Sequence, residues 1–255
     1  DYTRGLYLSG LGYYFAINDY MDLELTGDIY TRGTWAIEAR SRYLKRYKFT
    51  GSLSVNYRWD VTGEKDMPDY NVAKNLSVQW THTQDSKANP YNNFSASVNF
   101  STSGYSKYSA TSLNDILATQ TNSSIAYSKS WAGTPFSMSA NMSVSQNSQT
   151  RQLSVTLPNI SFNVARVYPF KRKDAMGKQR WYEKISLSYS GQMSNSISTK
   201  ENLLFKSSLV DDWRNGVKHT IPINATFQLF NHINITPSFN YTERWYFKKI
   251  NRGEI

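Results

Sequence analysis

The chain has 255 residues, is 39% hydrophobic and 15% aromatic, and carries a formal net charge of +10. It contains no cysteine, which excludes disulfide bonds, thiolate zinc sites and thiol catalysis. The positive charge points either to an anionic partner (nucleic acid, acidic lipid or a phosphorylated glycolipid) or to a solvated basic surface. No linker divides the sequence, so we expect residues 1–255 to form one domain.

Hydropathy excludes membrane-spanning helices, because no segment approaches the roughly 18 to 20 consecutive apolar residues that such a helix needs. The mean hydropathy is −0.59, a value usual for soluble proteins. Transmembrane strands alternate apolar and polar residues, however, and therefore have a low mean hydropathy even when one face contacts lipid. Residues 1–4 carry no apolar signal region, and we read the chain as a mature or excised segment.

Alternation with a period of two runs through the chain. Residues 11–17, 21–30 and 35–43 show it weakly. In residues 49–59 it is clear, with odd positions apolar or glycine and even positions polar. It recurs in residues 76–80, 94–100, 125–131, 136–144, 153–157, 185–189, 221–229 and 233–241. The pattern predicts an all-β fold of about twelve long antiparallel strands, each of about ten residues, a length that crosses an outer membrane when tilted. A soluble β-sandwich or jelly roll is the alternative.

The connections alternate in length. Short turns are expected at residues 18–19, 45–46, 133–134 and 231–232, and longer loops at residues 61–73, 105–117 and 201–216. Outer-membrane barrels separate short periplasmic turns from long extracellular loops in this way. The basic segment 166–180 is an exception, because it is long on the short-turn side. Pro158 and Pro237 interrupt strand patterns, which predicts bulges or an edge there.

No catalytic or metal-binding pattern is present in the sequence. The three histidines, His82, His219 and His232, lack the spacing of metal ligands, and no nucleophile elbow or phosphate-binding loop occurs. Aromatic residues share a face with Leu, Ile and Val, which suits lipid better than nucleic acid bases. We therefore expect no cofactor, no metal, no nucleic acid partner and no enzymatic activity.

Several segments carry a resemblance to a known family. They are residues 12–18 (GYYFAIN), 21–26 (MDLELT), 30–35 (YTRGTW), 40–43 (RSRY), 157–158 (LP), 168–171 (YPFK) and 241–246 (YTERWY). The chain resembles the LptD family of outer-membrane barrels, in its Bacteroidota branch. The matching features are a Tyr-Tyr-aromatic strand, a short turn, a hairpin with Tyr followed by Arg-Gly, and an Arg-Tyr strand end.

The resemblance implies that the chain is a transmembrane β-barrel segment, a little under half of a larger barrel. In that family the barrel transports lipopolysaccharide and inserts it into the outer leaflet through a lateral seam. The implied partners are lipopolysaccharide, an LptE-like lipoprotein plug, the periplasmic lipopolysaccharide-bridge proteins and membrane lipid, and the implied location is the cell outer membrane.

The resemblance also places the first strand beside the lateral seam. Better-known members weaken this strand with proline in an L-P-Y-Y-W stretch, and here Gly12 takes that place. The lateral-gate residues implied are Gly10, Gly12, Tyr13 and Tyr14. Glycine weakens a strand through backbone entropy, so replacing Gly10 and Gly12 by valine is expected to stiffen the gate. The alternative is that both glycines only make room for the neighbouring aromatic rings.

Two further groups of charged residues are candidates. The alternation places Glu24, Glu38, Arg40, Arg42 and Arg58 in a polar lumen. A candidate anion-binding or partner-binding group is formed by Lys171, Arg172, Lys173, Lys178 and Arg180, with a solvated loop as the alternative. For the whole chain, other functions are a diffusion porin or nutrient-uptake barrel, an outer-membrane lipid-modifying enzyme, and a soluble carbohydrate-binding sandwich.

Overall fold

The computed structural model of the chain describes residues 4–102, 120–147, 149–172, 177, 179–200, 213–229 and 233–247. Within these residues the chain is almost entirely β-strand, with a single short 3-10 helix, η1 (Trp181–Lys184). No helix in the described part is long and apolar enough to cross a membrane.

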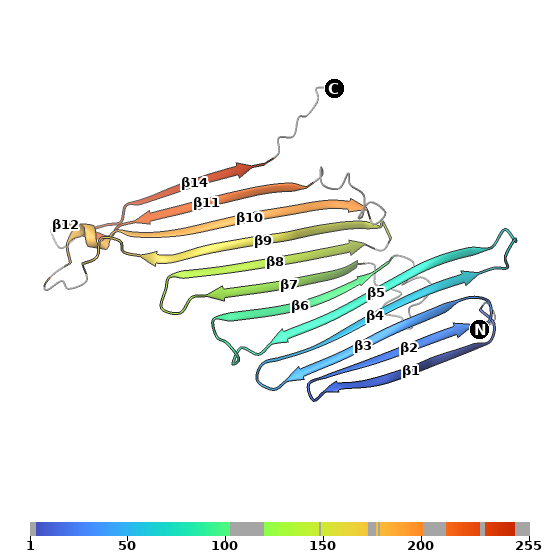
Figure 1. Ribbon diagram of the computed structural model, residues 1–255. Coiled ribbons are helices and arrows are strands. Elements are labelled where there is room, and N and C mark those ends of the chain that lie inside the picture. The colour runs from blue at the N-terminus through green and yellow to red at the C-terminus, as the bar shows by residue number, and fades with distance from the viewer. Residues whose placement is uncertain are drawn as a thin grey trace, which may run out of the picture. The chain divides into compact units, whose positions relative to one another are not determined.

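Twelve strands form one antiparallel sheet (Figure 1), in which β1 to β11 follow one another in sequence order and β14 lies beside β11. They are β1 (Tyr7–Asn18), β2 (Met21–Tyr30), β3 (Trp35–Lys45), β4 (Phe49–Thr62), β5 (Asn71–Gln84), β6 (Asn92–Ser101), β7 (Gln120–Ser130), β8 (Phe136–Asn147), β9 (Gln152–Val167), β10 (Ser186–Lys200), β11 (Arg214–Asn224) and β14 (Ser238–Tyr246). β1 and β14 are its two edges. This architecture confirms the prediction of about twelve long antiparallel strands.

The chain divides into two compact units, which are described separately below. The first unit contains Asp1–Ala126, Ser143–Val155 and Ser198–Asp212, and the second contains Tyr127–Met142, Thr156–Ile197 and Trp213–Ile255. The boundaries fall within β7 to β10, so the division does not coincide with a linker. That residues 1–255 form a single domain stays a prediction.

Strand register separates two chemically different faces in the first unit. Val55 of β4 pairs with Ala39 of β3 and Val78 of β5, whereas the adjacent Ser54 pairs with Arg40 and Gln79. Paired residues in adjacent strands point to the same side of a sheet, and successive residues point to opposite sides. One face is therefore apolar and the other polar across these strands.

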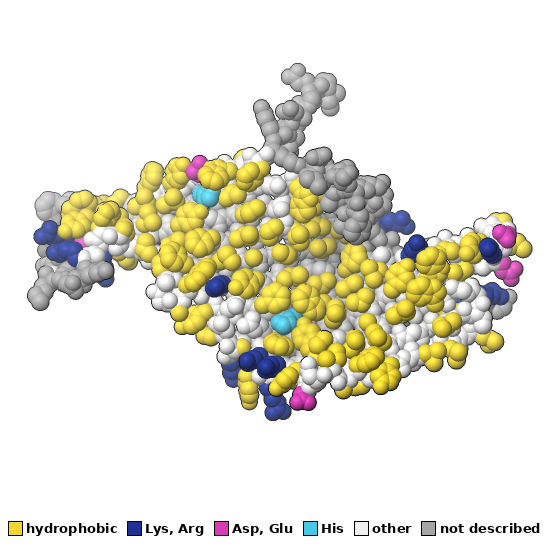
Figure 2. Space-filling model, viewed as in Figure 1, with side chains coloured by type: hydrophobic (Ala, Val, Ile, Leu, Met, Phe, Trp, Pro, Cys, Tyr) yellow, Lys and Arg dark blue, Asp and Glu magenta, His cyan; other side chains and the backbone are white. Residues whose placement is uncertain are grey.

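The apolar face is exposed, because few hydrophobic side chains are buried among the described residues. Large side chains on it remain accessible, including Ile37 in the first unit and Phe239 in the second, at 54% and 62%. Figure 2 shows hydrophobic side chains over much of the face turned to the viewer. Apolar surface this extensive is rare on soluble monomers and matches the lipid-facing band of a membrane barrel.

The structure corrects the prediction for residues 221–241. One long strand was expected on each side of a turn at residues 231–232, but β11 ends at Asn224 and β14 begins only at Ser238. Between them lies a separate hairpin of β12 (Phe227–Leu229) and β13 (Ile233–Ile235). Pro237 has no N–H for a ladder, although its carbonyl accepts a hydrogen bond from the Ala225 N–H at 3.1 Å.

Pro158 and the connections follow the predictions in part. Pro158 lies inside β9, which has a neighbour on each side, so the predicted alternative of a sheet edge at Pro158 is wrong. The connection between β9 and β10 is long, as expected, and contains η1. The predicted loop at residues 105–117 and most of the one at residues 201–216 lie outside the described residues.

Candidate functional site

β1 is an apolar edge strand with irregular pairing. Its only neighbour is β2, and all twelve of its residues are exposed. The β1–β2 register shifts twice, between Leu8 and Leu11 and again between Ala16 and Asn18. A strand with interrupted pairing loses ladder hydrogen bonds, so the β1–β2 pair is held less firmly than the regularly paired β4 and β5.

Gly10 lies at the first of these irregularities. Its φ angle is +70°, in the left-handed region where a side chain is strained. Its N–H donates to Oδ1 of Asp28 on β2 at 2.9 Å, and Oδ2 of the same carboxylate accepts from Arg58 on β4 at 3.4 Å. Asp28 therefore connects the bulge in β1 to an interior strand.

Gly12 has a steric role instead. A Cβ atom at this position would overlap the carbonyl oxygen of Leu25 and press on Thr26. The backbones of β1 and β2 approach too closely here for any side chain. Valine at Gly10 and Gly12 would therefore disrupt β1–β2 pairing, and this replaces the expectation that valine stiffens the strand.

The two tyrosines of the proposed gate lie on opposite faces. The ring of Tyr13 packs edge-on against Phe15 at a centroid distance of 4.7 Å, on the apolar face. The Tyr14 hydroxyl donates to Oδ2 of Asp22 at 3.3 Å, on the polar face. Of the two tyrosines, Tyr14 thus belongs to the polar surface described next.

The structure places the five predicted charged residues on one face of the first unit. Register aligns Glu24 with Arg40, Glu38 with Asn56, Arg42 with Ser52 and Arg58 with Ala36. Every carboxylate on this polar face of β2 to β4 has an arginine partner. The pairs are Arg40–Glu38 at 2.7 Å, Arg4–Asp60 at 3.1 Å, Arg42–Asp22 at 3.4 Å, Arg58–Asp28 at 3.4 Å and Arg40–Glu24 at 3.7 Å.

Sequence reasoning missed Asp22 and Asp28, which complete this ladder of ion pairs. Both stand at even positions of β2, in phase with Glu24, so the same alternation contained the signal. The exposed pairs of the ladder, such as Arg40–Glu24, contribute at most about 1 kcal/mol each to folding. The effect of the ion pairs is to pair every arginine of this ladder with at least one carboxylate.

Two histidines on the apolar face make a repeated arrangement that the sequence did not reveal. In the first unit the Tyr43 hydroxyl lies 3.0 Å from Nδ1 of His82, and its ring covers Gly51. In the second unit the Tyr189 hydroxyl lies 2.7 Å from Nδ1 of His219, beside Gly191. Each tyrosine fills the space above a glycine, so these histidines serve packing. Within the described residues no group of side chains could hold a metal ion.

The basic connection between β9 and β10 is organised by a buried acid. Nε of Arg172 donates to Oε1 of Glu183 at 2.5 Å, and the Arg180 N–H donates to Oε2 at 2.6 Å. The hydrogen bond from Arg172 and then the one from the Arg180 backbone lower the pKa of Glu183 to about 2. Glu183 also raises the pKa of Arg172. Arg172 is therefore committed to an internal ion pair.

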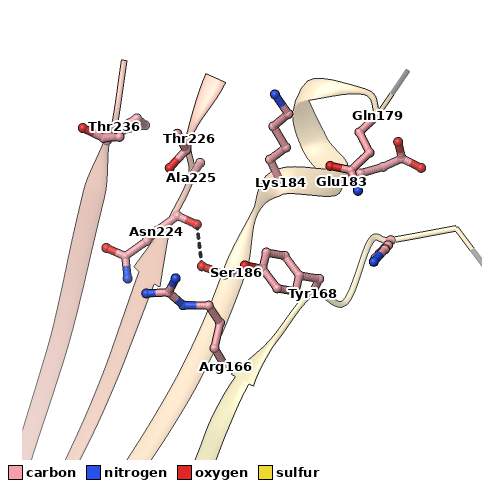
Figure 3. A pocket seen from close by; sticks show the side chains of 12 residues that line it. Arg166, Tyr168, Gln179, Glu183, Lys184, Ser186, Asn224, Ala225, Thr226 and Thr236 are labelled. Atoms are coloured by element: carbon pink, nitrogen blue, oxygen red, sulfur yellow. Dashed lines mark hydrogen bonds between the residues drawn. The ribbon is translucent and has the colours of Figure 1, made fainter. Parts of the chain in front are cut away.

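A pocket of about 610 Å³ lies beside this connection in the second unit. Its lining comes from the β9–β10 connection, the start of β10 and the connection that follows β11, and Lys171 is the one predicted residue in it. Figure 3 shows Arg166 and Tyr168 extending from the end of β9 toward Ser186 and Asn224. The Ser186 hydroxyl donates a hydrogen bond to the backbone carbonyl of Asn224 at 3.1 Å. The predicted residues Lys173 and Lys178 lie outside the described residues.

Long antiparallel strands with one exposed apolar face and one polar face define the class of outer-membrane β-barrel segments. A family model described as LptD protein matches residues 1–254, and the chain belongs to this family. No curated protein matches the chain.

Membership of the family confirms several of the predictions. The sheet is part of a transport barrel of the outer membrane that assembles lipopolysaccharide and is not an enzyme. The family also implies lipopolysaccharide and LptE as partners. The alternatives of a soluble sandwich and a lipid-modifying enzyme are thereby excluded, and lipopolysaccharide assembly replaces the porin alternative.

Proposed function

We propose that this chain delivers lipopolysaccharide into the outer leaflet through a lateral seam that opens beside β1. The observation that carries the proposal is the construction of β1. Its pairing with β2 is interrupted at Gly10 and depends on the absence of a side chain at Gly12. A strand with interrupted pairing separates from its neighbours at lower cost than a regularly paired strand.

The polar face of β2 to β4 supports the second part of the proposal, which is passage of the sugar headgroup through a hydrated lumen. Glu24, Glu38, Arg40, Arg42 and Arg58 would line that lumen. A transport path must bind its cargo weakly enough to release it. Arginines already paired with carboxylates are poor traps for the phosphates of the cargo, whereas an unpaired row of arginines would retain them.

The remaining partners follow from the same proposal. An LptE-like lipoprotein would occupy the lumen as a plug, and periplasmic bridge proteins would supply lipopolysaccharide at the short-turn end. Acyl chains would leave directly into lipid across β1, whose apolar residues such as Leu11 and Phe15 are exposed. Residues 1–255 would act as one segment of the closed barrel.

Crosslinking in the full-length barrel tests the proposal. One cysteine is placed in β1 on its free edge and one in the strand that meets it across the seam. The matched control places cysteines at Asn56 and Ser77, a directly paired position between β4 and β5. Surface lipopolysaccharide is measured in cells that depend on the variant, with barrel abundance checked separately.

Oxidation should block delivery by the seam pair and leave the control pair active, and reduction should restore delivery. Normal delivery by an efficiently crosslinked seam pair would show that the seam does not open during transport.

A further inference from the structure

The pocket beside η1 has an excess of positive charge. Three cations line it: Arg166 from the end of β9, Lys171 from the following connection and Lys184 from the end of η1. Glu183 is the single acid among the described lining residues, and its two carboxylate oxygens already accept hydrogen bonds from Arg172 and Arg180. No carboxylate of the described residues forms an ion pair with the three cations.

Glu183 does not neutralise the three cations, because at neutral pH it is ionised and already paired with Arg172. Its side chain is 1% exposed, and its pKa of about 2 keeps it charged and bonded to Arg172. The pair holds the connection in place beneath the pocket. The positive charges of Arg166, Lys171 and Lys184 are consequently left for a ligand.

The lining also supplies neutral hydrogen-bonding groups. Thr226 and Thr236 come from the two sides of the β12–β13 hairpin, and Asn224 and Gln179 contribute amides. Cations combined with hydroxyl and amide donors are the usual surroundings of a phosphate group. A volume of about 610 Å³ is within the range of small-molecule sites and would hold a lipid headgroup.

The position of the pocket indicates the setting in which it would meet a phosphate. It lies at the end of the strands that carries the β9–β10 and β11–β14 connections. The same connection exposes Tyr168, Phe170 and Trp181. Aromatic residues at strand ends mark the level of the lipid headgroups. A pocket at that level lies within reach of lipid headgroups.

We propose that this pocket binds the phosphodiester of an anionic phospholipid, with Arg166, Lys171 and Lys184 as its cationic ligands. The proposal goes beyond lipopolysaccharide delivery and does not depend on the seam. A bound lipid would fix the β9–β10 connection against the connection between β11 and β14.

Lipid retention by the full-length barrel, with its lipoprotein partner, tests the proposal. The complex is reconstituted into nanodiscs that contain phosphatidylglycerol and phosphatidylcholine, and the retained lipids are quantified after delipidation by native mass spectrometry. The pocket variant combines R166Q, K171Q and K184Q. The matched control combines K45Q, R46Q and K48Q, which removes three cations from the β3–β4 turn at the same end of the strands.

The pocket variant should lose phosphatidylglycerol retention about tenfold or more, since each lost charge-assisted contact is worth up to about a factor of ten. The control should retain it within about twofold of the unchanged protein. The single variant K184Q, combined with heat-modifiable mobility to report folding, should show a several-fold loss with an intact barrel.

Three results would overturn the proposal. Equal loss in the pocket and control variants would show attraction to general positive charge. Binding of inorganic phosphate without enrichment of phosphatidylglycerol would assign the pocket to a soluble anion. Unchanged lipid retention with loss of the lipoprotein partner from the pocket variant would assign it to acidic groups of that protein.

Discussion

β1–β2 and β4–β5 are both antiparallel pairs in the first unit with the same apolar and polar alternation, yet they are held together differently. Every residue of β4 pairs with β5, from Phe49 opposite Gln84 to Thr62 opposite Asn71, without a register shift. The β1–β2 pair shifts register twice. β4 is also bonded to β3 on its other side, whereas β1 ends the sheet.

The difference shows that side-chain alternation sets the faces of a sheet, while backbone details set how firmly a strand is attached. In β1 the bulge at Gly10 and the close approach at Gly12 limit pairing to a special geometry. Stability in a folded protein varies from region to region, and moving elements come from its low end. A weakly paired strand beside a regular sheet is what a lateral opening requires.

The largest effect is expected from a charge on the lipid side of the regular pair. Val55→Arg in β4 should reduce the free energy of unfolding in lipid vesicles by about 2 to 4 kcal/mol, because the arginine would lie near the middle of the apolar layer. Ser54→Arg is the control, because Ser54 lies on the polar face and its hydroxyl contacts Glu38. Equal losses in folding titrations would contradict the assignment of the two faces.

A second effect concerns Gly51, which lies in the regular pair. Gly51→Ala should destabilise the barrel by about 1 to 3 kcal/mol, the usual cost of overpacking, because the new methyl group would collide with the Tyr43 ring and the Thr81 carbonyl. Gly27→Ala is the control, since its methyl group would lie at an ordinary 3.5 Å from the Ala36 carbonyl oxygen. Thermal unfolding measures both, and a tolerated Gly51→Ala would show that Tyr43 moves freely.

Gly12→Ala should have a local effect in the irregular pair. The collision with the Leu25 carbonyl would loosen the β1–β2 pairing while β4–β5 stays paired, because the collision lies between β1 and β2 alone. Hydrogen exchange should become faster by an order of magnitude or more in residues 7–18 and stay unchanged in residues 49–62. Uniformly faster exchange would mean that β1 unfolds together with the sheet and is no separate element.

The smallest effect is expected at Asp28, which links the two regions. Asp28→Ala removes the acceptor for Gly10 and the partner of Arg58, at a cost of about 0.5 to 1.5 kcal/mol. Glu24→Ala, which breaks an exposed pair with Arg40, should cost less. Exchange at Gly10 and its neighbours reports the difference. Equal hydrogen-exchange rates at Gly10 in the two variants would show that Asp28 does not stabilise the bulge in β1.

Much of the architecture was contained in the sequence. A period of two identifies a strand wherever it occurs, because only an extended backbone sends successive side chains to opposite sides. It therefore gave the strands, the opposite faces of Val55 and Ser54, and the common face of Glu24 and Arg40. The order of short motifs in residues 12–43 indicated the family.

The tertiary structure alone decided how these residues are partnered, since partners are distant in sequence and depend on register. The sequence suggested that Lys171, Arg172 and Arg180 belong to one anion-binding group. In the structure Arg172 is paired with Glu183, and the cations that line the pocket are Arg166, Lys171 and Lys184. Gly12 looked flexible in the sequence, and the carbonyl of Leu25 makes it sterically necessary. Alternation fixes the side to which a residue points, and only the packed strands fix what it meets there.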